Sequence, residues 1–209
     1  MIQGSDEWKA ARCGKVTASR IADVVARTRS GWGASRANYA AELIAERLTG
    51  TPAEHFVNAA MQWGTDREPE GRMAYEWHTD TEVQQVAIVP HPRIPMSAAS
   101  PDGLVGEDGL VEIKCPNTAT HIDTLLDGKV PERYVLQMQW QMACTGRQWC
   151  DFVSFDPRMP ESMRLFIKRV ERDEKLIESL EKDVELFLRE VETKVAALRS
   201  VYEPEQEAA

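Results

Sequence analysis

Hydrophobic side chains recur with a helical period near both ends of this chain and fall into shorter runs in its middle. In the N-terminal part the pattern predicts a short helix that Thr17 begins, a second from Ser35 to Gly50, and a third around Ala59–Trp77 that a glycine and a proline interrupt. Between the first two lies Arg27–Arg36, an arginine-rich segment with turn-forming residues that we expect to be an exposed loop.

The middle of the chain contains short apolar runs separated by turn residues, which are typical of strands. A longer run, Tyr134–Cys144, predicts a buried helix, and Asp173–Arg199 predicts one long amphipathic helix. This order of elements predicts an α/β fold with a central mixed β-sheet flanked by helices. The expected strands are Thr81–Val89, Ser97–Ser100, Leu110–Lys114, Trp149–Phe155 and Met163–Val170.

The length of 209 residues suits a single domain, which we place at residues 1–200, followed by a flexible tail at residues 201–209. No window approaches the roughly 18 consecutive apolar residues of a membrane span. The N-terminus also lacks the basic stretch and apolar run of a secretion signal. We therefore expect a cytoplasmic protein.

The formal net charge of −9 argues against a protein coated with positive charge for general nucleic-acid binding. The charge is unevenly spread, however, because the first 50 residues contain eight basic and five acidic side chains. This basic segment holds Arg12 and Arg29.

The cysteines and histidines give no sign of a metal-thiolate or zinc site. No two cysteines form a C-x-x-C pair, and an iron–sulfur cluster would need a third closely spaced cysteine beside Cys144 and Cys150. His78 and His121 have no partner at ligand spacing. We expect all four cysteines to be free, buried thiols in a reducing compartment.

The sharpest chemical signal is Pro101-Asp102 followed, after nine intervening residues, by Glu112-Ile113-Lys114. Glu112 and Lys114 are two residues apart on a predicted strand, so their side chains leave the same face. A glycine-rich hairpin can bring Asp102 beside them. Two carboxylates and the main-chain carbonyl of Ile113 are hard oxygen ligands suited to Mg²⁺ or Mn²⁺. Lys114 would then orient a metal-bound water that attacks a phosphodiester, or help to deprotonate it.

The same spacing also occurs in ordinary surface strands. There Asp102 would cap a turn, and Glu112 and Lys114 would form a surface pair. The strand is otherwise apolar, however, so both charges would lie near the interior, where unpaired charge is costly. Charge in such a strand favours a functional site.

This arrangement resembles that of the PD-(D/E)XK nuclease superfamily. Further motifs narrow the resemblance to the phage lambda exonuclease (YqaJ-type) family of recombination nucleases, over roughly Gln3–Asp173. Several separated motifs in the right order are far more specific than any one of them. They are Gln3-Gly4-Ser5-Asp6-Glu7-Trp8, Arg12, Gly14, Thr17-Ala18-Ser19, Trp63-Gly64 with Glu68, Ser100-Pro101-Asp102-Gly103, Glu112-Ile113-Lys114-Cys115-Pro116, Tyr134 with Gln137 and Gln139, and Asp156-Pro157-Arg158-Met159.

The resemblance implies a role for each residue of the central constellation. Asp102, Glu112 and the backbone carbonyl of Ile113 would bind two Mg²⁺ ions, which Mn²⁺ could replace, and Glu68 would join them from its helix. Lys114 would position or activate the attacking water.

The resemblance also implies a pocket for the 5′-phosphate of the DNA end, formed by Arg12, Ser19, Ser100 and Gln137. A guanidinium group, two hydroxyls and an amide donor suit a terminal phosphate. Arg12 and Ser19 could instead cap the first helices, and Gln137 and Gln139 could be satisfied helix amides. Of these two amides, Gln139 is the better candidate for a structural role.

Two more residues fall where the family contacts DNA. Arg29 matches a side chain that enters the minor groove, and Met61 matches an apolar wedge that parts the terminal base pair, a leucine in the reference enzyme. We expect the tryptophans Trp63, Trp77 and Trp140 to lie in the core rather than to stack on bases.

The resemblance thus implies a metal-dependent 5′→3′ exonuclease that acts on double-stranded DNA ends and leaves 3′ single-stranded overhangs. It further implies a ring-shaped homotrimer threaded by DNA, a single-strand annealing protein as partner in phage-type recombination, and a bacterial host cytoplasm.

Three alternatives remain. One is an endonuclease or RecB-like flap nuclease on the same scaffold. Another is a non-catalytic DNA-end-binding module, which loss of Asp102, Glu112 or Lys114 would mark, and all three are present. A protein-interaction role would rest on the long C-terminal helix, whose apolar stripe we expect to pack on the sheet.

Overall fold

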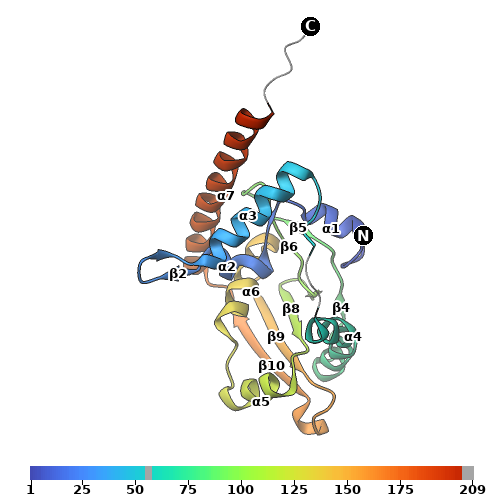
Figure 1. The fold of residues 1–209 in the computed structure, drawn as a ribbon. Helices are drawn as coiled ribbons and strands as arrows, with labels where there is room; N and C mark the ends of the chain where they lie inside the picture. The colour runs from blue at the N-terminus through green and yellow to red at the C-terminus, as the bar shows by residue number, and fades with distance from the viewer. Residues whose placement is uncertain (55–57, 204–209) are drawn as a thin grey trace.

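The computed structural model of the protein describes residues 1–54 and 58–203. Helices and strands are interspersed along the chain (Figure 1), which also contains two short 3₁₀ helices, η1 and η2. The elements are α1 (Asp6–Arg12), β1 (Val16–Thr17), η1 (Ala18–Arg20), α2 (Ile21–Val24), β2 (Arg27–Thr28), β3 (Gly31–Trp32), α3 (Ala34–Thr49), α4 (Ala59–Thr79), β4 (Val83–Gln84), β5 (Val89–Pro90), β6 (Ser97–Ala99), β7 (Gly103–Val105), β8 (Gly109–Lys114), α5 (Thr118–Asp127), α6 (Glu132–Thr145), β9 (Trp149–Phe155), η2 (Glu161–Met163), β10 (Leu165–Glu171) and α7 (Glu174–Tyr202).

The central sheet has five strands in the order β10-β9-β8-β7-β4. Strands β8 and β9 are parallel, and the other neighbours in this sheet are antiparallel. A smaller sheet with the order β1-β6-β5 stands beside it. The predicted α/β architecture with a mixed sheet flanked by helices is confirmed.

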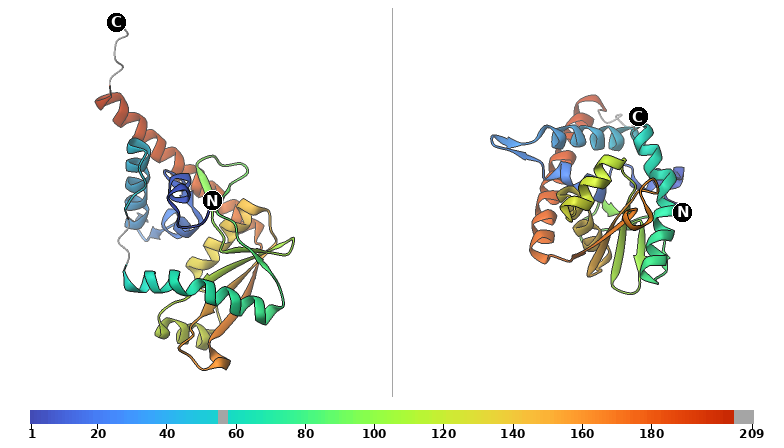
Figure 2. Two further views of the ribbon diagram at one scale, coloured as in Figure 1. Left: turned by 90° about the vertical axis from the view of Figure 1, so that its right-hand side faces the viewer. Right: turned by 90° about the horizontal axis from the view of Figure 1, so that it is seen from below.

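The two faces of the central sheet are covered by different helices (Figure 2). Side chains alternate along β8, so Val111 and Ile113 pack in one cluster with Tyr75 of α4. Leu110 points to the other face and packs with Met138 of α6. The active-site candidates of β8 are thus carried by a strand that is buried on both sides.

Helix α7 packs mainly against α2, α3 and α6. The expected sheet contact is confirmed only at its start, where Ile177 joins the cluster of Leu110 and Phe152. Its buried stripe, which includes Val184, Phe187 and Val191, joins Tyr39 and Leu43 in one core cluster. The reason is that α4 and α6 already occupy the two faces of the sheet. The helix runs to Tyr202, past the predicted start of the tail at residue 201, and residues 204–209 lie outside the described part.

Several local predictions are corrected by the structure. The expected loop Arg27–Arg36 contains the hairpin β2–β3, in which Arg27 pairs with Trp32. The third helix is one continuous segment despite its glycine and proline, and Asn58 caps it by accepting a hydrogen bond from Met61 N. The segment Thr81–Val89 holds only the two short strands β4 and β5. Helices α1 and α5 were not predicted.

Two expectations from composition can be compared with the described residues. Within residues 1–54 and 58–203, no helix combines the length and the apolar character that a membrane span requires. All four cysteines are free thiols, as predicted; Cys115, Cys144 and Cys150 are buried and Cys13 is half-buried.

Candidate active site

Strand β8 carries a glutamate and a lysine into the interior of the protein. Glu112 is fully buried. Its Oε1 accepts a 2.6 Å hydrogen bond from Gln137 Nε2, and its Oε2 accepts a 2.6 Å bond from Gln141 Nε2. Lys114 forms an ion pair with Glu112. Because buried charge persists only where partners compensate the lost hydration, the interpretation of these two residues as an exposed surface pair is wrong.

Asp102 lies between β6 and β7, beside the end of β8. Its Oδ2 accepts a 2.7 Å hydrogen bond from the main-chain N–H of Ile113. The next residue must be glycine, because a Cβ on Gly103 would lie 2.0 Å from Cγ1 of Val83 on β4. The hairpin β7–β8 therefore brings the aspartate to the Glu112-Ile113-Lys114 segment, as the spacing predicts.

Three carboxylates and one ammonium group act on one another at this end of β8. Burial raises the pKa of Asp102, and repulsion from Glu112 and Glu68 raises it further. Burial also raises the pKa of Glu68 on α4. Attraction from Lys114 opposes this increase, and repulsion from Glu112 adds to it. Burial alone would lower the pKa of Lys114, but attraction from Glu112 and Asp102 raises it above its ordinary value.

The donor chemistry of this cluster suits a hard divalent cation. Among residues 1–54 and 58–203, no three His, Cys, Asp or Glu side chains converge closely enough to form a complete metal site. The cluster nevertheless consists of carboxylates that repel one another in a desolvated place, and a cation relieves that repulsion. The residues that would hold it are Asp102, Glu112 and the carbonyl of Ile113, with Glu68 from α4.

The structure brings together two of the four residues assigned to a 5′-phosphate pocket. Arg12 Nη1 lies 3.3 Å from Ser100 Oγ, and Arg12 Nη2 lies 3.3 Å from Thr17 Oγ1. Ser19 is exposed on η1, which packs against α6. Gln137 donates to Glu112 instead, so it supports the carboxylate cluster.

Two residues at the site were missed from the sequence. Gln141 lies four residues after Gln137 on α6, and this helical spacing places both amides on one face, where they meet Glu112. Trp8 belongs to the N-terminal motif, and its Nε1 donates a 3.1 Å hydrogen bond to Ser100 Oγ. The repeat of glutamines on one helical face was a usable signal, whereas nothing in the local sequence links Trp8 to Ser100.

The two residues matched to DNA contacts both lie on the surface. Arg29 is exposed at the turn of the β2–β3 hairpin, which projects from the body of the molecule (Figure 1). Met61 lies in the first turn of α4 and is about half exposed, at 50%.

The three tryptophans expected in the core have three different surroundings. Trp140 is fully buried, as predicted. Trp63 is half-buried, with the Arg158 guanidinium 4.2 Å above its ring. Trp77 is 91% exposed, so its core placement is wrong. The reason is that α4 turns Tyr75 toward the sheet, which leaves Trp77 on the solvent side.

Gln139 has a structural role, as predicted, and His121 also forms hydrogen bonds within the fold. The Gln139 amide donates to the carbonyl of Glu171 at 2.7 Å and accepts from Asp173 N at 2.9 Å, so it ties α6 to the start of α7. The buried His121 ring hydrogen-bonds to Ser154 Oγ at 2.7 Å.

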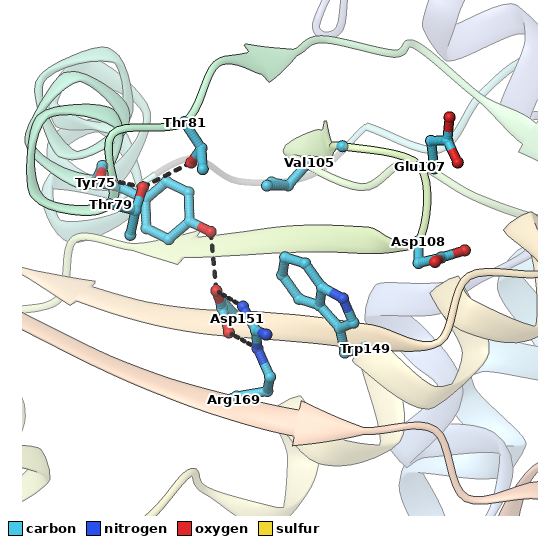
Figure 3. Close-up of a pocket in the computed structure, with 10 residues that line it drawn as sticks. Tyr75, Thr79, Thr81, Val105, Glu107, Asp108, Trp149, Asp151 and Arg169 are labelled. Carbon is cyan, nitrogen blue, oxygen red and sulfur yellow. Dashed lines mark hydrogen bonds and ion pairs between the residues drawn. The ribbon is translucent and has the colours of Figure 1, made fainter.

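A cavity of about 400 Å³ lies at the opposite end of the β8–β9 pair from Lys114 (Figure 3). Its central carboxylate, Asp151, accepts hydrogen bonds from Tyr75 at 2.9 Å and from Arg169 at 2.8 and 2.9 Å. The Arg169 guanidinium stacks on Trp149 at 3.5 Å. The hydrogen bonds among Tyr75, Asp151 and Arg169 connect α4, β9 and β10, and the cavity is distinct from the candidate active site.

Comparison with known proteins gives a consistent family match. Residues 7–148 match the YqaJ-like viral recombinase domain. The chain is similar to the crystal structure of an alkaline exonuclease (LHK-Exo) from Laribacter hongkongensis, with 54% sequence identity, 94% of this chain and 97% of that chain covered, and a TM-score of 0.88. The same enzyme in complex with dAMP matches equally well.

A second relative is more distant. A phage-related exonuclease from Haemophilus somnus 129PT shares 15% identity over 88% of this chain and 96% of that chain, with a TM-score of 0.70, which shows the fold alone. A search of curated proteins finds no match.

Proposed function

Because this chain belongs to the YqaJ-like viral recombinase family and has the PD-(D/E)XK nuclease fold, we propose that it is a DNA exonuclease of recombination. The observation that carries this proposal is the cluster of Asp102, Glu112 and Lys114 at the end of β8, with Glu68 from α4. Half-buried carboxylates and an ammonium group that gather around the fully buried Glu112 are costly to the fold, which favours a chemical role.

The proposed reaction is hydrolysis of a phosphodiester with Mg²⁺ as cofactor. Two such ions, replaceable by Mn²⁺, would supply the Lewis acidity that stabilises charge on the phosphate. Asp102, Glu112 and the Ile113 carbonyl would hold them. Glu112 is kept in place by the two glutamine amides of α6. Lys114 would donate hydrogen bonds to the attacking water or to a phosphate oxygen.

The proposed direction is 5′→3′, with a 3′ single-stranded overhang as the lasting product. Its support is the pair Arg12 and Ser100, a guanidinium and a hydroxyl that suit the 5′-phosphate of a DNA end. The relative solved with dAMP contains a deoxynucleoside monophosphate, the class of product that such an enzyme releases. Ser19 and Gln137 would complete the pocket only if their side chains turned toward it.

Further parts of the proposal rest on the family assignment. Arg29 on the projecting hairpin would enter the minor groove, and Met61 would part the terminal base pair. The enzyme would act as a ring-shaped homotrimer around DNA and deliver the overhang to a single-strand annealing protein in the bacterial cytoplasm. Light scattering tests the trimer independently of the chemistry.

The test of the proposed activity uses blunt duplex DNA labelled at either end. With Mg²⁺, a label at the 5′ end should be released at once, whereas a label at the 3′ end should stay on a strand that shortens progressively, and with EDTA nothing should be released. A covalently closed circle should remain intact, because an exonuclease needs an end. Cutting of the circle would instead support the endonuclease alternative, and binding of ends without release would support a non-catalytic module.

A further inference from the structure

The N-terminal segment is fastened to the residues that precede Asp102. Gln3 Nε2 donates hydrogen bonds to the carbonyls of Val86 and Pro101, at 2.7 and 2.8 Å. Trp8 Nε1 donates to the carbonyl of Ala87 at 2.8 Å. Helix α1 is therefore docked directly on the segment that enters the active site.

The same indole N–H also reaches the hydroxyl of Ser100, which has two lone pairs and one hydrogen. Its oxygen accepts from Trp8 Nε1 at 3.1 Å and from Arg12 Nη1 at 3.3 Å. Both lone pairs are thereby engaged. In the part of the chain that the structure describes, no acceptor lies within reach of the remaining hydrogen, and Ser100 is only half-buried. The hydroxyl is thus left to act as a donor to a ligand.

The ring face of Trp8 has a second role, because it carries the Arg12 guanidinium at 4.1 Å from the ring centroid. The hydrogen bonds of this guanidinium go to two hydroxyls, those of Ser100 and Thr17. Among the described residues no carboxylate forms an ion pair with Arg12. The nearby Glu46 carboxylate instead accepts from main-chain N–H groups, at 2.7 and 2.8 Å. A half-buried cation without a direct ion-pair partner is a place for an anion.

We propose that Trp8 is the positioning residue of the pocket for the 5′-phosphate of a DNA end. Its indole N–H occupies an acceptor site of the Ser100 hydroxyl and leaves that hydroxyl free to donate. Its ring face orients the Arg12 guanidinium, so that Ser100 and Arg12 can both bind one phosphate. This inference rests on the proposed function, since it assumes that the pocket receives a DNA end.

The test compares blunt duplexes that carry a 5′-phosphate or a 5′-hydroxyl at the end. The variant Trp8→Phe keeps an aromatic ring and removes the N–H donor with its hydrogen bonds to Ser100 and Ala87, and Ser100→Ala removes the hydroxyl. Binding is measured by fluorescence anisotropy in EDTA, so the readout needs no catalysis, and the rate of the first cleavage is measured with Mg²⁺. The exposed Trp77→Phe is the matched control.

The wild type and Trp77→Phe should bind the phosphorylated end more tightly. Trp8→Phe should reduce this preference by about three- to tenfold, the size of one hydrogen bond. Ser100→Ala should do the same, and the double variant should lose no more than Ser100→Ala alone, because the indole N–H acts through the hydroxyl.

Three results would overturn the proposal. One is a Ser100→Ala variant that prefers the phosphorylated end as strongly as the wild type does. This result would count against the proposal even if Trp8→Phe did not fold. Another is an equal loss of affinity for both ends in folded Trp8→Phe, which would make Trp8 a purely structural residue. The third is a wild type that releases nucleotides but ignores the phosphate. A wild type that releases no nucleotides would instead refute the exonuclease activity itself.

Discussion

Gln137 on α6 donates a 2.6 Å hydrogen bond to Oε1 of Glu112 on β8, across the interface between the helix and the sheet. The family resemblance assigns this glutamine to a phosphate pocket, but in the structure it compensates a fully buried carboxylate. The charge of Glu112 is thus compensated by hydrogen bonds from α6, so the packing of this helix directly affects the candidate active site.

Replacing Gln137 with leucine should destabilise the protein. The variant removes one of the two donors to Oε1 of the buried carboxylate and leaves only Lys114 there, which costs about 1–3 kcal/mol of unfolding free energy. Urea denaturation measures this change, with the exposed Gln85→Leu as a control that should stay within about 0.5 kcal/mol of the wild type. Equal stability of Gln137→Leu and the wild type would show that the hydrogen bond does not hold Glu112.

His91 should make the stability of the fold depend on pH. Its Nδ1 accepts main-chain hydrogen bonds from Arg93 and Ile94, at 3.2 and 3.1 Å. Burial lowers the pKa of His91 below its ordinary value of 6.5, although attraction from Glu181 opposes this. The unfolded chain therefore binds the proton more tightly. The unfolding free energy should be at its full value above pH 6.5 and should fall as the pH drops toward the lowered folded pKa.

The variant His91→Asn isolates this contribution, because the amide oxygen can accept the same main-chain hydrogen bonds and does not titrate. Its unfolding free energy should fall less than that of the wild type between pH 7.5 and pH 5.5. The exposed His78→Asn should behave like the wild type. Identical pH dependence of His91→Asn and the wild type would remove His91 from the explanation.

Trp32 should fix the projecting hairpin. The guanidinium groups of Arg27 and Arg36 each lie 4.0 Å from its ring centroid, and both arginines also form ion pairs with carboxylates of α7. Trp32→Ala removes the ring on which both guanidinium groups stack, which should destabilise the hairpin by about 1 kcal/mol. Trypsin should then cleave after Arg29 several-fold faster than in the wild type, whereas Trp77→Ala should not change the rate. An unchanged rate in Trp32→Ala would mean that the hairpin is rigid without this stack.

The parts of the fold that could be predicted are those where one short pattern determines the outcome. The period of the C-terminal segment predicted α7, and the spacing of Glu112 and Lys114 with the glycine-rich turn placed them beside Asp102. These features depend on neighbours in the chain, so the sequence holds the needed information locally.

The features that were missed depend on distant partners. The arginine-rich segment forms a hairpin because the Trp32 ring packs on Arg36, which in turn forms an ion pair with α7. No local sequence pattern reveals these contacts. Trp77 was expected to be buried from its size alone, yet its position on α4 faces solvent. Gln137 meets Glu112 only after α6 has packed on the sheet.

The central claim is that the cluster at the end of β8 performs the chemistry. Its most direct test is Mg²⁺-dependent release of nucleotides from a 5′-phosphorylated blunt duplex by the wild type, Asp102→Asn and Lys114→Ala. The exposed Glu107→Gln serves as the control, and all variants are checked for folding by circular dichroism. Both site variants should lose at least about a hundredfold in rate while Glu107→Gln retains full activity. Release at the wild-type rate by a folded Asp102→Asn or Lys114→Ala would contradict the assignment of the active site.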